Sequence, residues 1–218
     1  MTLQHIAVII DGNRRFAKAR GLKPWDGHEK GAENVKNFIE WNKELGIKEI
    51  TVYCLSTENL KRDKLELSFL FKIFKAFFKK YKNNEEYNVR FIGDLSLVPG
   101  DIKELGEEIE EKTKNNSGMK INFCFSYGGR LELLKTINKL KNKPGEITEE
   151  DITNNLWLSS EPQLIIRTGN AVRTSNFLPW QSVYSEWVFL EKMWPEFTKQ
   201  DLVACIEEFD NRKRNFGK

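Results

Sequence analysis

The chain has 218 residues, of which 39% are hydrophobic and 31% are charged, and its formal net charge is +3. This length and apolar content suit one α/β domain and exclude a disordered chain. The small net charge argues against a dedicated nucleic-acid-binding protein, so we expect no nucleic-acid partner.

The N-terminus lacks a basic region followed by a long apolar stretch, so we expect no signal peptide. No segment approaches the roughly 18 apolar residues that span a bilayer. Cys54, Cys124 and Cys205 are odd in number and widely spaced, which fits neither a disulfide framework nor a zinc site. We therefore expect a cytoplasmic protein whose cysteines are buried thiols.

Segments rich in Ile and Val alternate with helical patterns along the chain. We expect strands at 6–10, 50–55, 89–92, 120–125, 163–167 and 187–190, and helices at 29–45, 65–82, 102–114, 130–142, 149–158 and 199–213. This alternation predicts an α/β fold in which residues 1–218 form a single domain with a central, mostly parallel sheet flanked by helices. Such sheets bind ligands beyond the carboxyl ends of their strands, so the residues that follow each strand are candidate site residues.

The first strand is followed by Asp11, Gly12, Asn13, Arg14 and Arg15, at the expected start of a helix. Glycine lets the backbone approach a ligand, and arginine binds phosphate with two parallel hydrogen bonds. An aspartate at such a site requires a divalent cation between it and the phosphate. Alternatively, Asp11 caps the helix and the arginines are solvated.

Polar residues also follow the second and fifth strands. Each group is compatible with an ordinary polar loop, but all of these loops are expected at the same edge of one sheet. The helix expected beside them carries an apolar stripe, which indicates either a helix buried against the sheet or the wall of a tunnel for a hydrocarbon. The stripe consists of Leu67, Leu70, Phe71, Phe74, Phe77, Phe78 and Tyr81. Together these features suggest a substrate with phosphates at one end and hydrocarbon at the other.

Several common motifs are missing. The sequence contains no GxxxxGK[ST], no GxGxxG and no GxSxG, which excludes a P-loop enzyme and leaves a dinucleotide-binding fold and an α/β-hydrolase without their signatures. With two histidines in the chain, a histidine-based metal cluster is also excluded.

The sequence resembles the cis-prenyltransferases, the family that includes undecaprenyl diphosphate synthase and dehydrodolichyl diphosphate synthase. The similarity runs from "HIAVIIDGNRRFA" through "GHEKGAENV", "TVYCLSTENLKR", "INFCFSYGGR" and "LIIRTGNAVRTSNFLPWQSVYSE" to "RKRNFG". It implies an apolar tunnel beside the sheet, a homodimer, and Mg²⁺ as cofactor. It also implies that isopentenyl diphosphate is condensed with an allylic prenyl diphosphate to a polyprenyl diphosphate with cis double bonds, as in the synthesis of lipid carriers.

The resemblance implies a role for individual residues. Asp11 matches the family's catalytic aspartate, which engages the allylic diphosphate and its Mg²⁺, and Asn59 matches a catalytic position near the reacting carbons. Glu186 matches an acidic residue that is associated with Mg²⁺ and that reaches the site from the other subunit. The matched substrate-binding residues are Gly12, Asn13, Arg15 and His28 around the allylic diphosphate, Ser56 and Arg62 near the reacting carbons, and Arg167, Arg173 and Ser175 in the isopentenyl diphosphate site.

Five positions depart from the family pattern. Pro24 and Asn215 stand where many members have arginine, Leu60 where many have tryptophan, Asn170 replaces a glycine, and Ala171 replaces an acidic residue. These departures leave open the product length, the preferred primer and the regiochemistry of coupling. The alternatives are a relative with altered chemistry (a short product, an unusual acceptor or coupling other than head-to-tail) and a non-catalytic partner subunit.

A long polyprenyl product leaves the enzyme into a bilayer, so peripheral membrane contact is a further expectation. Lysines surround the Phe-rich helix, where they either meet anionic lipid or form an ordinary solvated face. They are Lys61, Lys64, Lys72, Lys75, Lys79 and Lys80.

Overall fold

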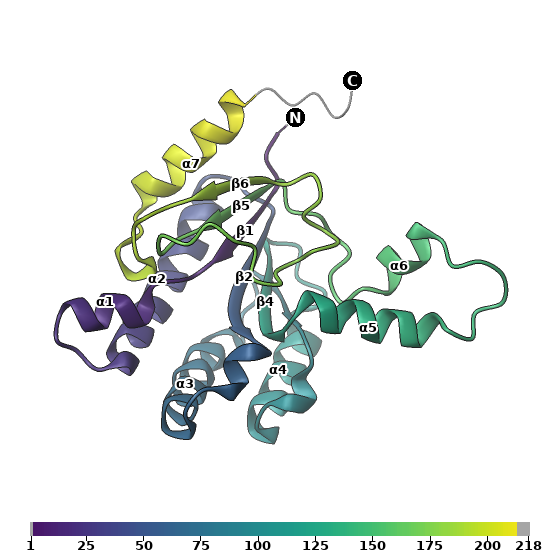
Figure 1. Cartoon of the computed structure of the whole chain (residues 1–218), viewed down its shortest axis with the longest axis horizontal. Helices are drawn as coiled ribbons and strands as arrows, with labels where there is room; N and C mark the ends of the chain where they lie inside the picture. Colours follow the sequence, from purple (N-terminus) through teal and green to yellow (C-terminus); the bar gives the residue numbers. More distant parts are fainter. Residues whose placement is uncertain (1, 213–218) are drawn as a thin grey trace.

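The computed structural model describes residues 2–212, and its centre is a six-stranded sheet (Figure 1). The strands lie in the order β3-β4-β2-β1-β5-β6, and every neighbouring pair is parallel. The expected α/β fold is therefore confirmed, and all six expected strands are present. They are β1 (His5–Ile9), β2 (Glu49–Ser56), β3 (Asn88–Ile92), β4 (Lys120–Tyr127), β5 (Leu164–Arg167) and β6 (Glu186–Phe189).

Six of the α-helices in the described part of the chain lie near the ranges expected for them. The start of a seventh, α1, was also expected after the first strand, but its seven residues contain too few apolar side chains to show a helical period, so no range was predicted for it. α2 begins earlier than expected, at Pro24, because proline suits the first position of a helix. The helices are α1 (Asn13–Ala19), α2 (Pro24–Glu44), α3 (Lys64–Phe78), α4 (Gly100–Thr113), α5 (Gly129–Leu140), α6 (Glu149–Asn155) and α7 (Lys199–Asn211). Lys213, the expected end of the last helix, lies outside the described residues.

The two faces of the sheet are covered differently. Alternate strand residues point to opposite faces, and in β1 Ile6 and Val8 join a core with residues of α2, α3, α4 and α7. Ala7 and Ile9 join a smaller cluster with the irregular segments 157–158 and 177–178. The four long helices thus gather on one face, and loops cover the other.

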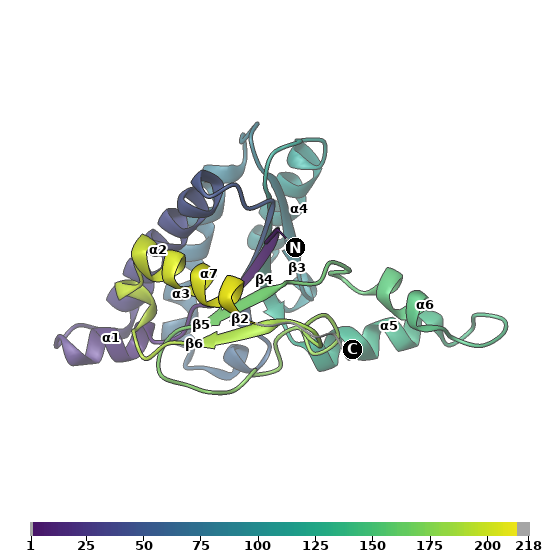
Figure 2. The same ribbon diagram turned by 90° about the horizontal axis from the view of Figure 1, so that it is seen from above.

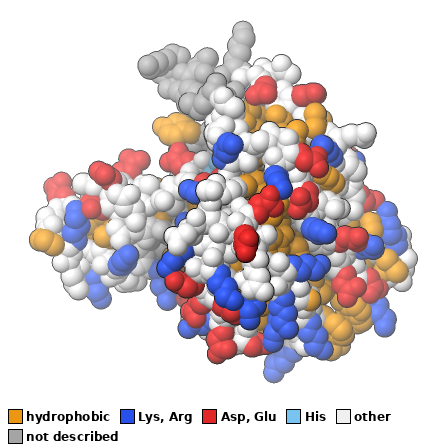
Figure 3. All heavy atoms as spheres, turned by 180° about the vertical axis from the view of Figure 1, so that it is seen from behind, with side chains coloured by type: hydrophobic (Ala, Val, Ile, Leu, Met, Phe, Trp, Pro, Cys, Tyr) orange, Lys and Arg blue, Asp and Glu red, His pale blue; other side chains and the backbone are white. Residues whose placement is uncertain are grey.

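α5 and α6 project from the body as an arm, on the side opposite α1 (Figures 1 and 2). Leu134 and Ile137 of α5 are 57% and 50% exposed, although both are apolar. On the space-filling surface seen from behind, Lys and Arg are interspersed with Asp and Glu (Figure 3). Within residues 2–212, every helix is too short or too polar to cross a membrane.

The cysteines are free thiols in the structure. Cys124 and Cys205 are buried, as expected, and Cys54 is half-buried.

α1 and α2 pack closely because α2 carries two glycines one turn apart. A Cβ atom added to Gly27 would lie 2.1 Å from the backbone oxygen of Asn13, and one added to Gly31 would lie 2.3 Å from Asn13 Oδ1. The absence of side chains at these positions brings α2, with His28 between the two glycines, against the start of α1.

We expect Gly27→Ala to lower the free energy of unfolding by about 1–3 kcal/mol, because the added methyl group overlaps a backbone atom and α1 has to move. Urea denaturation measures this difference. Gly100→Ala is the matched control, since a Cβ atom there has no heavy atom within 4 Å and should be neutral or slightly stabilising. Equal stabilities of the two variants would contradict the close packing of α1 on α2.

Candidate active site

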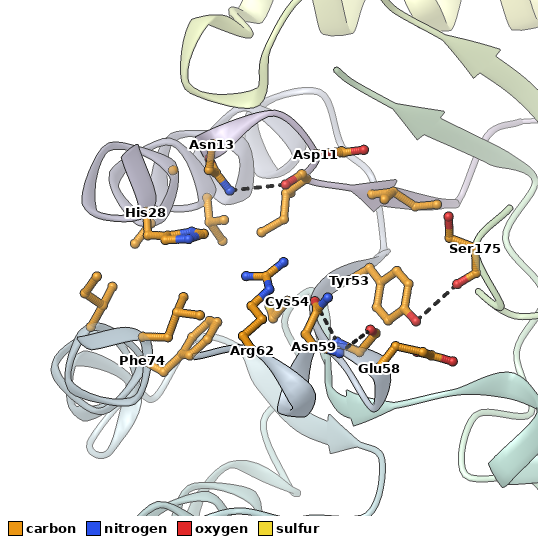
Figure 4. Close-up of a pocket in the computed structure, with 18 of the residues that line it drawn as sticks. Asp11, Asn13, His28, Tyr53, Cys54, Glu58, Asn59, Arg62, Phe74 and Ser175 are labelled. Carbon is orange, nitrogen blue, oxygen red and sulfur yellow. Dashed lines mark hydrogen bonds between the residues drawn. The ribbon is translucent and has the colours of Figure 1, made fainter. Parts of the chain in front are cut away.

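A cavity of about 560 Å³ lies where β1, β2 and β5 end, and α2 and α3 form its outer walls (Figure 4). One part of its lining is polar and the other is apolar. The polar part consists of Asp11, Asn13, His28, Ser56, Glu58, Asn59, Arg62, Arg167, Arg173, Ser175 and Asn176. The structure therefore brings together the residues singled out after three different strands. Of the remaining predicted residues, Gly12 and Arg15 adjoin Asp11, whereas Glu186 lies elsewhere.

The apolar part lies between α2 and α3. Val35 of α2 faces Leu70, Phe74 and Phe77 of α3 across it. The Phe74 ring packs edge-on against Phe125 of β4, with ring centroids 4.7 Å apart. The first interpretation of the apolar stripe is therefore confirmed, because α3 is buried against the sheet. α3 also lines a cavity of the size that holds small ligands, and the tunnel for a hydrocarbon stays a prediction.

Asp11, which follows β1, forms one ion pair with Arg15 of α1 and another with Arg167 at the end of β5. Its Oδ1 atom lies 3.0 Å from Arg15 Nη2, and its Oδ2 atom lies 3.0 Å from Arg167 Nη2. The N-cap of α1 is Gly12 and makes no side-chain cap hydrogen bond. The alternative that Asp11 caps this helix is therefore wrong, because its carboxylate is engaged by two guanidinium groups instead.

Two glycines permit this arrangement. Gly12 has φ +108°, and an added Cβ atom would lie 2.7 Å from Met193 Sδ. Gly169 has φ +86°, and an added Cβ atom would lie 2.8 Å from Arg15 Nη2. Both the left-handed backbone and the close approach require glycine at these positions.

Arg167 organises the loop that follows β5. Its side chain is 3% exposed, and its guanidinium group donates to the backbone oxygen of Arg173 and, at 2.7 Å, to Ser175 Oγ. The later part of the loop closes around it with left-handed backbone at Ser175 (φ 52°), Asn176 (φ 62°) and Leu178 (φ 48°). Arg167 Nε is buried without a hydrogen-bond partner, so one donor of this group is left over.

Ser56 and Asn59 bind each other at the end of β2. Asn59 Oδ1 accepts a hydrogen bond from the Ser56 backbone N–H at 3.3 Å, and Ser56 Oγ accepts one from the Asn59 backbone N–H at 3.1 Å. This reciprocal pair fixes the short 3-10 turn Glu58–Lys61 (η1), whose first two residues, Glu58 and Asn59, line the cavity.

His28, Arg62 and Arg14 surround one carboxylate at the mouth of the cavity. Glu66 Oε1 lies 3.5 Å from His28 Nε2, 3.4 Å from Arg62 Nη1 and 3.7 Å from Arg14 Nε. Burial, together with the positive charge of Arg62, lowers the pKa of His28 to about 4 against the opposing effect of Glu66. His28 is therefore neutral near pH 7.

Glu186 lies at the other end of the sheet. It pairs in register with Leu164 at the start of β5, whereas Arg167, at the end of β5, pairs with Phe189. Its Oε2 atom accepts a hydrogen bond from Arg212 Nη1 at 2.7 Å. Within one chain it is remote from Asp11, so a role for Glu186 at the metal requires a second copy of the chain and stays a prediction.

The side chains of this site that could bind a metal suit Mg²⁺ only together with a substrate. In proteins Mg²⁺ is usually held by one or two carboxylates and by substrate phosphates. Asp11 supplies such a carboxylate, and among residues 2–212 no group of three or more His, Cys, Asp or Glu side chains could hold a metal.

Three residues that belong to this site were not predicted from the sequence. The spacing of four between Arg62 and Glu66 is typical of a helical ion pair and could have revealed Glu66. Glu58 and Asn176 lie in the polar segments that follow the second and fifth strands, but nothing local indicates that they meet: Asn176 Nδ2 donates to Glu58 Oε1 at 3.1 Å across 118 residues of sequence.

The structure explains some departures from the family pattern. Pro24 starts α2, and Leu60 packs against the main core. Asn170 has φ +52°, a conformation that asparagine adopts more readily than most residues, so it can replace glycine there. Ala171 is buried, and Asn215 lies outside the described residues.

Comparison with known proteins gives one consistent result. The prenyltransferase family model described as undecaprenyl diphosphate synthase matches residues 9–217. The chain is 42% identical to the tritrans,polycis-undecaprenyl-diphosphate synthase (geranylgeranyl-diphosphate specific) of Pyrobaculum aerophilum, over 98% of this chain and 95% of that one. It is also 42% identical to the isoprenyl transferase of Thermotoga maritima, over 98% and 96% of the two chains.

Solved structures agree with the sequence comparison. The lavandulyl diphosphate synthase of Lavandula x intermedia, in complex with dimethylallyl diphosphate, superposes with a TM-score of 0.94 at 32% identity and covers 100% of this chain and 99% of that chain. A probable undecaprenyl diphosphate synthase from Campylobacter jejuni superposes with a TM-score of 0.86 at 34% identity, with full coverage of both chains.

The lowered pKa of His28 predicts a pH-dependent stability. Between about pH 6.5 and pH 4 the unfolded state binds a proton that the folded state does not, so stability falls as the pH falls through this window. From pH 7 to pH 5 we expect the unmodified protein to lose about 2 kcal/mol more unfolding free energy than His28→Gln. Urea denaturation of both proteins at the two pH values measures this difference in unfolding free energy. The contribution of His5 is the same in both proteins and cancels in the comparison. An equal loss in both proteins would show that His28 titrates normally.

Proposed function

The chain belongs to the undecaprenyl diphosphate synthase family of cis-prenyltransferases, and from this premise we propose that it condenses isopentenyl diphosphate with an allylic prenyl diphosphate to give a polyprenyl diphosphate with cis double bonds. The observation that carries the proposal is the two-part cavity. Its polar part offers guanidinium, amide and hydroxyl groups for two diphosphates, and its apolar part offers room for a hydrocarbon tail.

The donor diphosphate is assigned to the start of α1. Asp11, Asn13 and Arg15 stand there, and His28 is held beside them by the packing of α2 on α1. Asn13 Oδ1 is buried without a partner; as an acceptor it can bind a water that in turn donates to a phosphate oxygen. A neutral His28 can donate a hydrogen bond to a phosphate oxygen without adding charge.

The acceptor diphosphate is assigned to the loop after β5. The Arg173 side chain lines the cavity, and Ser175 Oγ is held beside it by Arg167. The Arg167 guanidinium donates to Arg173, Ser175 and Asp11, and its Nε–H, which has no partner in the protein, is left for a phosphate oxygen. Holding the two diphosphates in register supplies much of the acceleration, because the reacting carbons then meet in one geometry. Asn59, fixed by Ser56, stands between the two groups as the proposed second catalytic residue.

Mg²⁺ is proposed as the cofactor, with Asp11 as its protein ligand and Glu186 of a second copy as a further acidic group. When bound, the cation neutralises charge that develops on the departing diphosphate. Asp11 also balances Arg15 and Arg167, so its carboxylate serves the fold as well as the ligand site.

A homodimer is proposed from the surface that one chain leaves exposed. Leu134 and Ile137 on the arm, and Val183 and Tyr184 before the edge strand β6, are all at least half exposed. Soluble monomers seldom leave so many apolar side chains uncovered in neighbouring elements. Trp187 and Phe189 of β6 stack on each other and are only partly buried.

A second function has one specific observation in its favour. The similarity in fold to a lavandulyl diphosphate synthase shows that the same architecture also occurs in an enzyme that is named for lavandulyl diphosphate and binds dimethylallyl diphosphate. A short product or coupling other than head-to-tail is therefore the alternative. A non-catalytic partner subunit is disfavoured, because Asp11, Gly12 and Asn13 are all in place. Peripheral membrane contact through the lysines around α3 stays a prediction.

Product analysis tests the proposed function. Purified protein is incubated with Mg²⁺, labelled isopentenyl diphosphate and, separately, allylic diphosphates of one to four isoprene units, and the products are resolved by chain length. We expect a ladder that ends at one length. A single short or branched product would favour the alternative, and no product from any primer would reject both.

We expect Asp11→Asn to lower the rate of product formation by about 100-fold or more, because a neutral amide does not balance two guanidinium groups and binds Mg²⁺ more weakly than a carboxylate does. Asp101→Asn removes an exposed carboxylate that pairs with Lys75 and is the matched control. A Mg²⁺-dependent rate in Asp11→Asn that equals the control would reject the role assigned to Asp11.

We expect the protein to sediment as a dimer at micromolar concentration and Leu134→Glu to shift it to a monomer, because a charge would be buried in the interface. Leu22→Glu, an exposed leucine on the α1 side of the molecule, should leave the dimer intact. A monomeric unmodified protein would overturn this assignment.

A further inference from the structure

The condensation needs a group that accepts a proton, and this inference rests on the proposed function. The C1–O bond of the donor breaks and its electrons leave with the diphosphate. The C3=C4 electrons of the acceptor form the new bond to that C1, which leaves a positive charge on C3. The electrons of the acceptor's C2–H bond then form the new C2=C3 double bond, and the C2 proton passes to a base.

Two carboxylates line the cavity in the described part of the chain, Asp11 and Glu58. Asp11 is a poor candidate, because each of its oxygens already faces a guanidinium group at 3.0 Å. Both oxygens are therefore already engaged by Arg15 and Arg167, and the proposed metal would occupy the same carboxylate.

His28 is the other group in the cavity that could take up a proton. It is neutral, but Arg62 and Arg14 lie around it, and their charges oppose its protonation. Figure 4 also shows it at the far end of the cavity from Ser175, beside Phe74. The acceptor's C2 is next to the carbon that carries the diphosphate, so the base has to stand near the residues that hold that diphosphate.

Glu58 stands at the Ser175 end of the cavity (Figure 4). Its Oε1 atom accepts a hydrogen bond from Asn176 Nδ2 at 3.1 Å, and its Oε2 atom accepts one from Thr57 Oγ1 at 3.3 Å. Asn176 follows Ser175 directly and is itself fixed by the backbone N–H of Arg130 at 2.9 Å. The carboxylate is therefore tied to the acceptor loop by neutral donors, and no cation within residues 2–212 pairs with it.

We propose that Glu58 is the base that accepts the C2 proton of the acceptor. A C–H bond next to a carbocation is so acidic that a weak base suffices. Partial burial opposes ionisation of Glu58, but hydrogen bonds from its own backbone, Ser56, Asn176 and Thr57 outweigh it and hold the pKa of the carboxyl below its usual value. The carboxylate is thus ionised at neutral pH, its charge stabilises the cation that precedes proton transfer, and its exposure lets the proton pass on to water.

Glu58→Gln tests the assignment, because glutamine keeps an oxygen for Asn176 and removes only the basic charge. We expect the single-turnover rate at saturating substrates to fall by about 10²–10⁴-fold with little change in KM. We also expect a primary isotope effect with isopentenyl diphosphate deuterated at C2, larger than in the unmodified protein, because proton removal becomes rate-limiting. Glu33→Gln, on the exposed face of α2, controls for loss of a charge.

Each outcome decides the question. A Glu58→Gln rate within threefold of the unmodified protein would overturn the proposal and assign the proton to another group, such as the released diphosphate. A slow variant with an unchanged isotope effect would also overturn it, since Glu58 would then only position the loop. An unmodified protein that forms no product would reject the proposed function and this inference together.

Discussion

The ion pair between Asp11 and Arg167 is the constraint on which the rest of the site depends. β1 lies at the point of the sheet where the strand order reverses, with β2, β4 and β3 to one side and β5 and β6 to the other. Ligands of open parallel sheets bind at such a point. A guanidinium group that is 3% exposed has to be paired there, because removing one partner of a buried ion pair costs about 3–5 kcal/mol. Asp11 therefore stabilises the fold through the same carboxylate that is proposed to bind the ligand.

The loop after β5 gains its shape from this buried arginine. Left-handed backbone at Ser175, Asn176 and Leu178 costs of order 1 kcal/mol or more at each residue. Hydrogen bonds from Arg167 and the stacking of the Tyr53 ring on Phe177, with centroids 4.6 Å apart, offset that cost. The result is a loop whose polar groups are held in place before any ligand arrives, which lowers the entropy that binding has to overcome.

Much of this architecture could be predicted from the sequence. The features that could not be predicted have one physical cause in common. Runs such as Ile6 to Ile10 mark strands by composition, and strands of a parallel sheet end at one edge, so Asp11, Ser56 and Arg167 were expected to meet. A helix was expected to start after the first strand, but the seven residues of α1 are too few to show a period that would give its range. Helix capping by Asp11 was excluded only by its contacts with Arg15 and Arg167. Glu58 and Asn176 join segments 118 residues apart, and no local pattern encodes such a contact.

The apolar end of the cavity has a consequence for how this enzyme can change over evolution. The rings of Phe74, Phe77 and Phe78 that form its wall pack edge-on against Phe125, Phe123 and Phe91 of the sheet. The proposed pocket for the hydrocarbon tail is therefore built from the same side chains that hold α3 to the protein. Replacing a phenylalanine by alanine in such a core costs about 3–5 kcal/mol. A mutation that deepens this pocket therefore removes a large share of the unfolding free energy of a typical domain. Relatives that make longer products are expected to carry compensating substitutions elsewhere in the core.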